Sequence, residues 1–316
     1  MNAHNHDHGH PHDHHGHDHH RDHHGHGHAH ASPDDPRYIL AIVLNLTIVL
    51  AEAGGGIVAH STALVADAGH NLSDVLGLVL AGGAAWLARR PAKGRRTYGF
   101  GKATVLAALA NGIVLMLVSG GIVLEAVQRL LRPEAIHAPL VIGIAAIGVV
   151  VNTLTALMFL RGRADDVNVR GVFVHMAGDA AISVGVIIAA GVILWTGWSW
   201  LDPLVSIGIV AVIVAGTWGL LREAIDLSLD AAPPGADLES IQDFLLASPG
   251  VTEVHDLHVW AMSTTETALT AHLVRPEHDG LDQFRGALAH ALEDRFGVRH
   301  ATLQIERSRG EDCPGC

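Results

Sequence analysis

Two pairs of metal-binding residue types recur at one spacing, in two separate apolar segments of the sequence. The first pair is His70 and Asp74, and the second is His175 and Asp179. A spacing of four places both members of a pair on one face of an α-helix, one turn apart. Ionisable side chains cost roughly 2.5 kcal/mol or more each inside a bilayer, so they are rare there and usually functional. Together the two imidazoles and two carboxylates form a tetrahedral set suited to a zinc-like ion.

The alternative for any one of these groups is a hydrogen bond that joins neighbouring helices. The recurrence of the whole pair at the same spacing favours the metal site. Asp67 stands seven residues before Asp74 and is predicted to pair with nearby backbone or polar groups rather than with metal. Glu52, next to a run of small residues, is either a helix-packing group or part of a proton or ion route.

The composition is that of an integral membrane protein with a modest soluble part. The 316 residues are 49% hydrophobic and only 16% charged. Each of six apolar segments is close to the length that crosses the hydrocarbon. These predicted spans are residues 38–58, 62–87, 105–127, 139–160, 173–195 and 203–221. They define a six-helix transmembrane domain over residues 37–228.

The links between these segments predict the topology. The second and fourth links are rich in Arg and Lys, whereas the fifth has two Trp and no basic residue. By the positive-inside rule, the even-numbered links and both termini are cytoplasmic. Arg129 and Arg132 in the third link are exceptions to this pattern. The first apolar run starts near Tyr38 and is long enough to span, so no signal peptide is expected. A single chain without organelle signals favours a bacterial inner membrane.

The segment before the first span, residues 1–36, is a low-complexity tract. Residues 4–30 hold 15 of the 25 histidines, mixed with Asp and Gly. Such a composition cannot form a core, so we expect a disordered cytoplasmic tail that buffers metal. An expression tag is the alternative, but tags are homopolymeric. The acidity of the two terminal regions argues against binding to nucleic acid.

Residues 229–316 form a separate soluble domain in this interpretation. The pattern predicts a helix over 237–246, strands over 251–262 and 265–274, a helix over 281–296 and a strand over 300–306. This αββαβ order indicates an α+β, ferredoxin-like domain. Its core is small, so a dimer partner would help to stabilise it. Cys313 and Cys316 end the chain as a C-x-x-C pair, which in the cytosol is more often metal-binding or redox-active than a structural disulfide.

Several of these motifs resemble the cation diffusion facilitator family of divalent-metal/proton antiporters. They occur in the family's order at residues 63–74, 98–102, 175–179, 202–203 and 255–260. The resemblance covers residues 38–316. A His-x-x-x-Asp pair in both the second and the fifth span resembles the zinc-preferring branch.

The resemblance implies functional residues by position. The two His-x-x-x-Asp pairs match the transport site between spans two and five. His255, His272 and Glu306 match metal positions in the cytoplasmic domain. Cys313 and Cys316 match a terminal pair that, in some relatives, reaches such a site in the neighbouring subunit of a homodimer.

His258 is set apart from these expected cytoplasmic ligands. Strand alternation places it with Asp256, on the face opposite His255. Some bacterial relatives carry a further metal site between spans two and three. Here the link at 89–96 is basic and lacks His, Asp and Glu, so we expect contact with anionic lipid headgroups and no metal.

The implied function is export of zinc from the cytoplasm in exchange for protons, by alternating access and without enzymatic activity. One rival is a cobalt- or cadmium-preferring exporter, since the ligand set does not fix selectivity. Another is a membrane metal buffer or sensor that transports nothing. An intramembrane metalloenzyme is disfavoured because the sequence contains no His-Glu-x-x-His motif.

Overall fold

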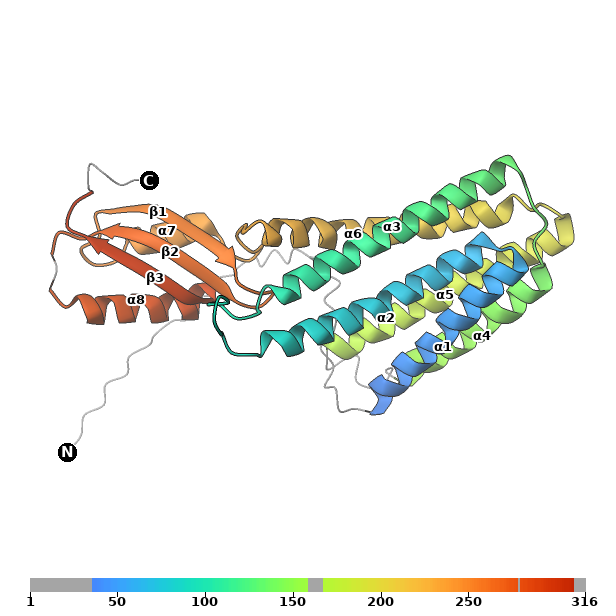
Figure 1. The fold of residues 1–316 in the computed structure, drawn as a ribbon, viewed down its shortest axis with the longest axis horizontal. Coiled ribbons are helices and arrows are strands. Elements are labelled where there is room, and N and C mark those ends of the chain that lie inside the picture. The colour runs from blue at the N-terminus through green and yellow to red at the C-terminus, as the bar shows by residue number, and fades with distance from the viewer. Residues whose placement is uncertain (1–35, 159–166, 278, 310–316) are drawn as a thin grey trace, which may run out of the picture.

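The computed structural model describes residues 36–158, 167–277 and 279–309 as an elongated molecule, with a helical bundle at one end and an α+β domain at the other (Figure 1). The bundle consists of α1 (Pro36–Ala59), α2 (Thr62–Ala88), α3 (Ala103–Leu131), α4 (Ala138–Met158), α5 (Val167–Thr196) and α6 (Leu201–Ser228). All six are long and apolar enough to cross a membrane. The six predicted spans are therefore confirmed as helices.

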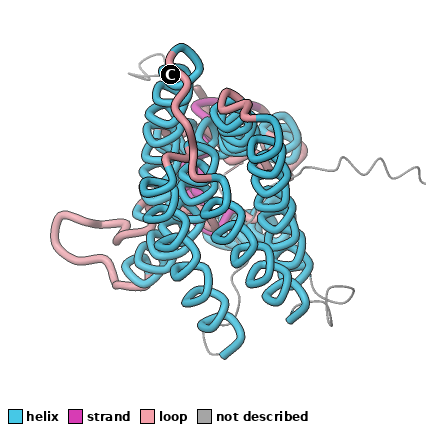
Figure 2. Tube along the Cα trace, turned by 90° about the vertical axis from the view of Figure 1, so that its right-hand side faces the viewer, coloured by secondary structure: helices cyan, strands magenta, loops and turns pink. Residues whose placement is uncertain are grey.

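The six helices stand side by side (Figures 1 and 2), and many of their large apolar side chains are exposed. Within the bundle α3 packs on α6 and α2, while α4 packs on α5 and α1. Large side chains such as Leu50 and Leu117 point outward and are 67% and 71% exposed. Such a surface suits hydrocarbon rather than water. The chain is thus a multi-pass membrane protein.

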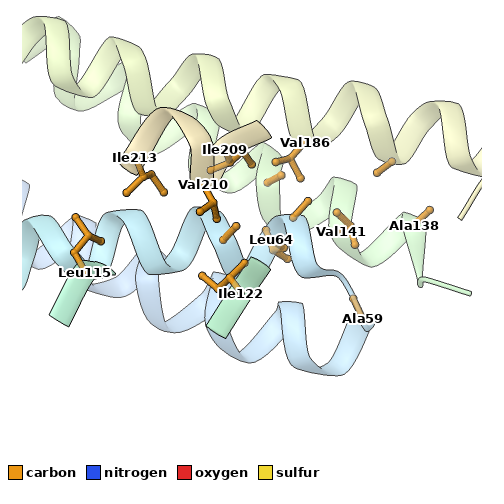
Figure 3. Packing of buried hydrophobic residues seen from close by; sticks show 14 residues of the cluster. Ala59, Leu64, Leu115, Ile122, Ala138, Val141, Val186, Ile209, Val210 and Ile213 are labelled. Carbon is orange, nitrogen blue, oxygen red and sulfur yellow. The ribbon is translucent and has the colours of Figure 1, made fainter. Parts of the chain in front are cut away.

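An apolar cluster of 14 buried residues fills the bundle between the helices (Figure 3). Leu64 of α2, Val186 of α5 and Val210 of α6 are among its members. On α2 and α5 the cluster lies on one side of the His-x-x-x-Asp pairs, toward the start of α2 and the end of α5. This end of the bundle is consequently closed by packed hydrocarbon side chains.

The first and third links meet at this closed end. The His137 amide donates to the Ala59 carbonyl oxygen over 2.9 Å. The Arg129 guanidinium donates to the His60 carbonyl oxygen and pairs with Glu125 over 2.6 Å. Arg129, an exception to the charge pattern, is therefore held by protein groups at the C-terminal end of α1.

A carboxylate from α6 caps the start of α2 at the same end. Asp202, 2% exposed, accepts hydrogen bonds from the Ser61 hydroxyl at 2.5 Å and from the Thr62 amide at 2.7 Å. The Thr62 hydroxyl also donates to it, over 2.8 Å. The first amides of a helix lack partners within the helix, and the helix dipole favours negative charge there. Asp202 thus anchors α2 to α6 across 140 residues of sequence.

The soluble domain consists of α7 (Leu238–Leu246), β1 (Glu253–Ala261), β2 (Thr267–Val274), α8 (Leu281–Phe296) and β3 (Val298–Glu306). Its sheet order is β1-β2-β3, with β1 antiparallel and β3 parallel to β2. The parallel pair requires a crossover, which α8 supplies. The predicted αββαβ order is confirmed. Residues of α7 and α8, including Ile241 and Leu292, share one core with Leu269 and Leu273 of β2.

The soluble domain contacts the end of the bundle that lies opposite Asp202. Lys102, just before α3, forms an ion pair with Asp230, just after α6. The Thr264 amide, in the β1–β2 turn, donates to the Thr104 hydroxyl over 3.1 Å. The domain therefore contacts the start of α3 and the end of α6.

Asp202→Asn is expected to destabilise the bundle. The amide nitrogen of Asn would face hydrogen-bond donors, and a buried donor left without an acceptor costs about 1–3 kcal/mol. We expect a lower thermal unfolding temperature in detergent, read by intrinsic fluorescence. Asp226→Asn, at an exposed position of the same helix, is the control. Equal unfolding temperatures for Asp202→Asn and the control would show that the cap contributes little.

Candidate metal centre

The two His-x-x-x-Asp pairs face each other across α2 and α5. His70 Nε2 lies 3.4 Å from Asp179 Oδ1, and His175 Nε2 lies 3.3 Å from Asp74 Oδ2. Within each helix, the His–Asp distances are 3.9 Å for His70 with Asp74 and 3.7 Å for His175 with Asp179. Each imidazole thus contacts both carboxylates. The structure brings all four predicted site residues together.

The arrangement suits a divalent cation. Ligand atoms of His70, Asp74 and Asp179 lie within 4.8 Å of one another, and His175 completes the group through its contacts with both carboxylates. The Asp179 side chain is 2% exposed, whereas that of His175 is 39% exposed. The cluster is therefore closed at Asp179 and open at His175. Two nitrogen and two oxygen ligands match the preference of zinc and its chemical neighbours.

Two further carboxylates are buried beside this cluster. Asp67 is fully buried and accepts a hydrogen bond from the Ser183 hydroxyl over 2.9 Å. Its predicted role as a partner of nearby polar groups is confirmed. Glu52 is fully buried as well, and the Asn71 amide donates to its Oε2 over 3.0 Å. Both hydrogen bonds cross between helices.

A second cluster lies on the sheet of the soluble domain. His255 and His272 are directly opposite each other on β1 and β2. His255 Nε2 is 3.3 Å from Glu306 Oε2, and His272 Nδ1 is 3.1 Å from Glu306 Oε1. Leu273 packs against the helices, so by alternation His272 points to the opposite face of the sheet. Two imidazoles and one carboxylate, with ligand atoms within 4.8 Å, fit a zinc-like ion that leaves one position for a further ligand.

Strand alternation predicted that Asp256 lies on the face opposite His255, away from this cluster, and that prediction is wrong. Its Oδ2 lies 3.5 Å from His272 Nε2, and its Oδ1 lies 2.9 Å from His258 Nε2. The register of β1 shifts between His255 and His258, and Asp256 has a positive φ of 51°. A bulge breaks the simple alternation of a strand, so the face assignment fails there. Sequence reasoning therefore missed Asp256 as a partner of His272 beside the cluster.

Glu306 is ionised at neutral pH. Desolvation acts to raise the pKa of Glu306, but hydrogen bonds from Gln304 and His255 outweigh it and hold the pKa below its ordinary value. This carboxylate is consequently available as an anionic ligand at any pH near neutrality. Cys313, Cys316 and the His-rich segment lie outside the described residues.

Comparison with known proteins identifies the family. Residues 38–227 match the family described as the cation efflux transmembrane domain, and residues 233–308 match the cation efflux protein cytoplasmic domain. The chain belongs to the cation efflux family. The resemblance to cation diffusion facilitators is thereby confirmed.

Curated relatives of this cation efflux protein align with most of its length. The metal cation efflux system protein CzcD of Cupriavidus metallidurans is 35% identical over 272 residues, which are 84% of this chain and 85% of the relative. The zinc transporter ZitB of Escherichia coli is 35% identical over 282 residues, 88% of this chain and 90% of the relative. The cadmium, cobalt and zinc/H(+)-K(+) antiporter of Bacillus subtilis is 32% identical over 273 residues, which are 85% of this chain and 88% of the relative.

A solved structure of the metal-bound C-terminal domain of the CzcD transporter from Cupriavidus metallidurans is also similar. It is 35% identical, with a TM-score of 0.21. The match covers 22% of this chain and 99% of that one.

Asp256→Ala is expected to weaken metal binding at the sheet cluster, because Asp256 contacts the imidazole of His272. Loss of such a contact typically costs about 10- to 100-fold in affinity. Zinc titration calorimetry measures this in a protein that lacks residues 1–35 and carries Asp179→Ala, so that the tail and the membrane cluster do not contribute. His290→Ala, exposed on α8, is the control. Unchanged affinity in Asp256→Ala would remove Asp256 from the site.

Proposed function

We propose that this cation efflux protein is a zinc/proton antiporter that exports zinc from the cytoplasm. The single observation that carries the proposal is the crosswise contact of His70 and His175 with both Asp74 and Asp179, between α2 and α5. Four ligand residues then hold the transported ion. The names of the relatives support this direction and cargo, since they include a zinc transporter and a cation efflux protein.

The ligand chemistry supports coupling to protons. Neutral imidazoles and ionised carboxylates hold a dication and offset its charge in the apolar bundle. Histidine exchanges protons close to neutral pH, so protons compete with the metal for the same atoms. On the side where protons are abundant, they displace the ion. Shared ligands are the simplest physical basis for antiport.

The proposed transport cycle alternates access to this site. The apolar cluster that includes Leu64 and Val186 closes the Asp202 end of the bundle, so the described conformation suits entry of metal from the other end. Rearrangement of one helix group against another then opens the closed end. Both termini and the soluble domain lie in the cytoplasm in this scheme, and the membrane is a bacterial inner membrane. The proposed domains are residues 1–36, 37–228 and 229–316.

The soluble domain is proposed to bind zinc and to form the homodimer. His255, His272 and Glu306 hold the ion, and Cys313 and Cys316 supply further ligands from the end of the chain. The match to the cation efflux cytoplasmic domain supports this assignment, as does the geometry of the donor set. Metal bound there would stabilise the dimer and bias the transport equilibrium, which is linkage between two sites.

Cobalt or cadmium is the rival cargo. The relative from Bacillus subtilis is named for cadmium and cobalt as well as zinc. A site with two imidazoles and two carboxylates discriminates weakly among these ions. The relatives are transporters and efflux proteins, so we propose that the chain is not an enzyme.

Zinc uptake into proteoliposomes under an imposed pH gradient tests the proposed function. The wild type is expected to take up zinc only with the gradient. His175→Ala and Asp179→Ala are each expected to lower the rate at least tenfold, because each removes a ligand. His290→Ala should transport at the wild-type rate. Cobalt, cadmium and manganese in the same assay give the order of preference.

Two outcomes would contradict the proposal. Normal zinc transport by Asp179→Ala would exclude the four-ligand site. Tight zinc binding by the wild type without uptake would favour a buffer or sensor.

A further inference from the structure

A carboxylate that does not belong to the metal cluster lies deep in the bundle. Glu52 of α1 is fully buried, and its Oε2 accepts the hydrogen bond from Asn71. Its Oε1 has no hydrogen-bond partner among the described residues. This oxygen points to the backbone of α4 at Gly148, where a β-carbon would lie only 2.8 Å from Oε1 and 3.3 Å from Ser183 Oγ. The absence of a side chain at Gly148 thus makes room for the carboxyl group.

No basic side chain balances Glu52 in the described part of the chain, where no ion pair to it occurs. Among the described residues, the charged side chains that act most strongly on Glu52 are Asp67 of α2 and Asp179 of α5, and both are acidic. Those that act on Asp67 include His70 and Asp179. From α4 the neighbour is Gly148, which carries no charge. An unpaired carboxylate in such surroundings is costly, and each neighbouring carboxylate increases that cost.

The hydrogen bonds around Glu52 show a shortage of donors. Asn71 is fully buried, and its Oδ1 has no partner among the described residues. Oδ1 of the buried Asp67 also has no hydrogen-bond partner among the described residues. With Oε1 of Glu52, three acceptor atoms therefore lack a donor. A protonated carboxyl group is a donor, whereas an ionised one only accepts. A proton on Glu52 would remove the electrostatic cost of burying its negative charge. It would also supply one of the missing hydrogen-bond donors.

We propose that Glu52 is a proton-binding residue of the transporter, separate from the metal ligands. The inference rests on the proposed function. When the cluster of His70, Asp74, His175 and Asp179 holds no metal, Glu52 carries a proton. When a dication binds, its positive charge near Asp179 favours the ionised form of Glu52. The O–H bond of the carboxyl group then breaks and the proton passes to water. One proton thus leaves Glu52 for each ion that binds, in addition to protons that leave the ligands.

The test is the number of protons released per zinc bound. Zinc titration calorimetry on the full chain, in two buffers that differ in ionisation enthalpy, gives this number. Glu52→Gln is neutral at every pH and keeps an acceptor for Asn71. We expect it to bind zinc but to release about one proton fewer than the wild type. Glu52→Asp should restore the release. The His-rich segment contributes equally to all three proteins, so the difference reports Glu52.

Two results would overturn this inference. One is equal proton release by the wild type and Glu52→Gln at both neutral and mildly acidic pH. The other is loss, in both Glu52→Gln and Glu52→Asp, of the zinc binding that Asp179→Ala also removes, while each elutes as a folded protein; this would make Glu52 a structural residue. Failure of the proposed function would appear instead in the wild type, as zinc binding without gradient-driven uptake. The two failures are therefore distinguishable.

Discussion

The bundle is organised by the need to bury carboxylates that no Lys or Arg of the described residues balances. Each buried carboxylate of the described helices meets this constraint in its own way. Asp202 uses the free amide and hydroxyl groups at the start of α2. Asp67 accepts a hydroxyl hydrogen bond from α5. Asp179 faces two imidazoles, which can take up either protons or a metal ion.

The contacts that stabilise these carboxylates differ in how easily they can be exchanged. Backbone amides do not titrate, so the Asp202 cap is a permanent attachment. Imidazole nitrogens exchange protons and metal near neutral pH, so the pairing around Asp179 is changeable. Glu52 has no cationic partner within the described part of the chain, so its charge depends on its surroundings. The bundle therefore combines fixed attachments at its closed end with exchangeable contacts at its centre.

Much of this arrangement was predictable from sequence because it is local. Hydrophobic length defined the spans, a spacing of four defined His70 with Asp74 and His175 with Asp179, and alternating patterns gave the order of the soluble domain. Features that depend on tertiary contacts were not predictable. Asp202 finds its partners 140 residues away, and the bulge that brings Asp256 to His272 leaves no signal in the local pattern. The donor shortage around Glu52 involves α1, α2 and α4, so no single segment reveals it.

The cap at Asp202 also determines which parts of the molecule can separate. It joins α2 to α6, α6 packs on α3, and the soluble domain holds α3 and α6 at their other ends. His70 and Asp74 thus belong to one continuous body that runs from the closed end of the bundle to the soluble domain. His175 and Asp179 are carried by α5, which packs mainly on α4. In the proposed alternating access, a displacement of α5 against that body would divide the ligand set in half, two ligands staying with the body and two leaving with α5.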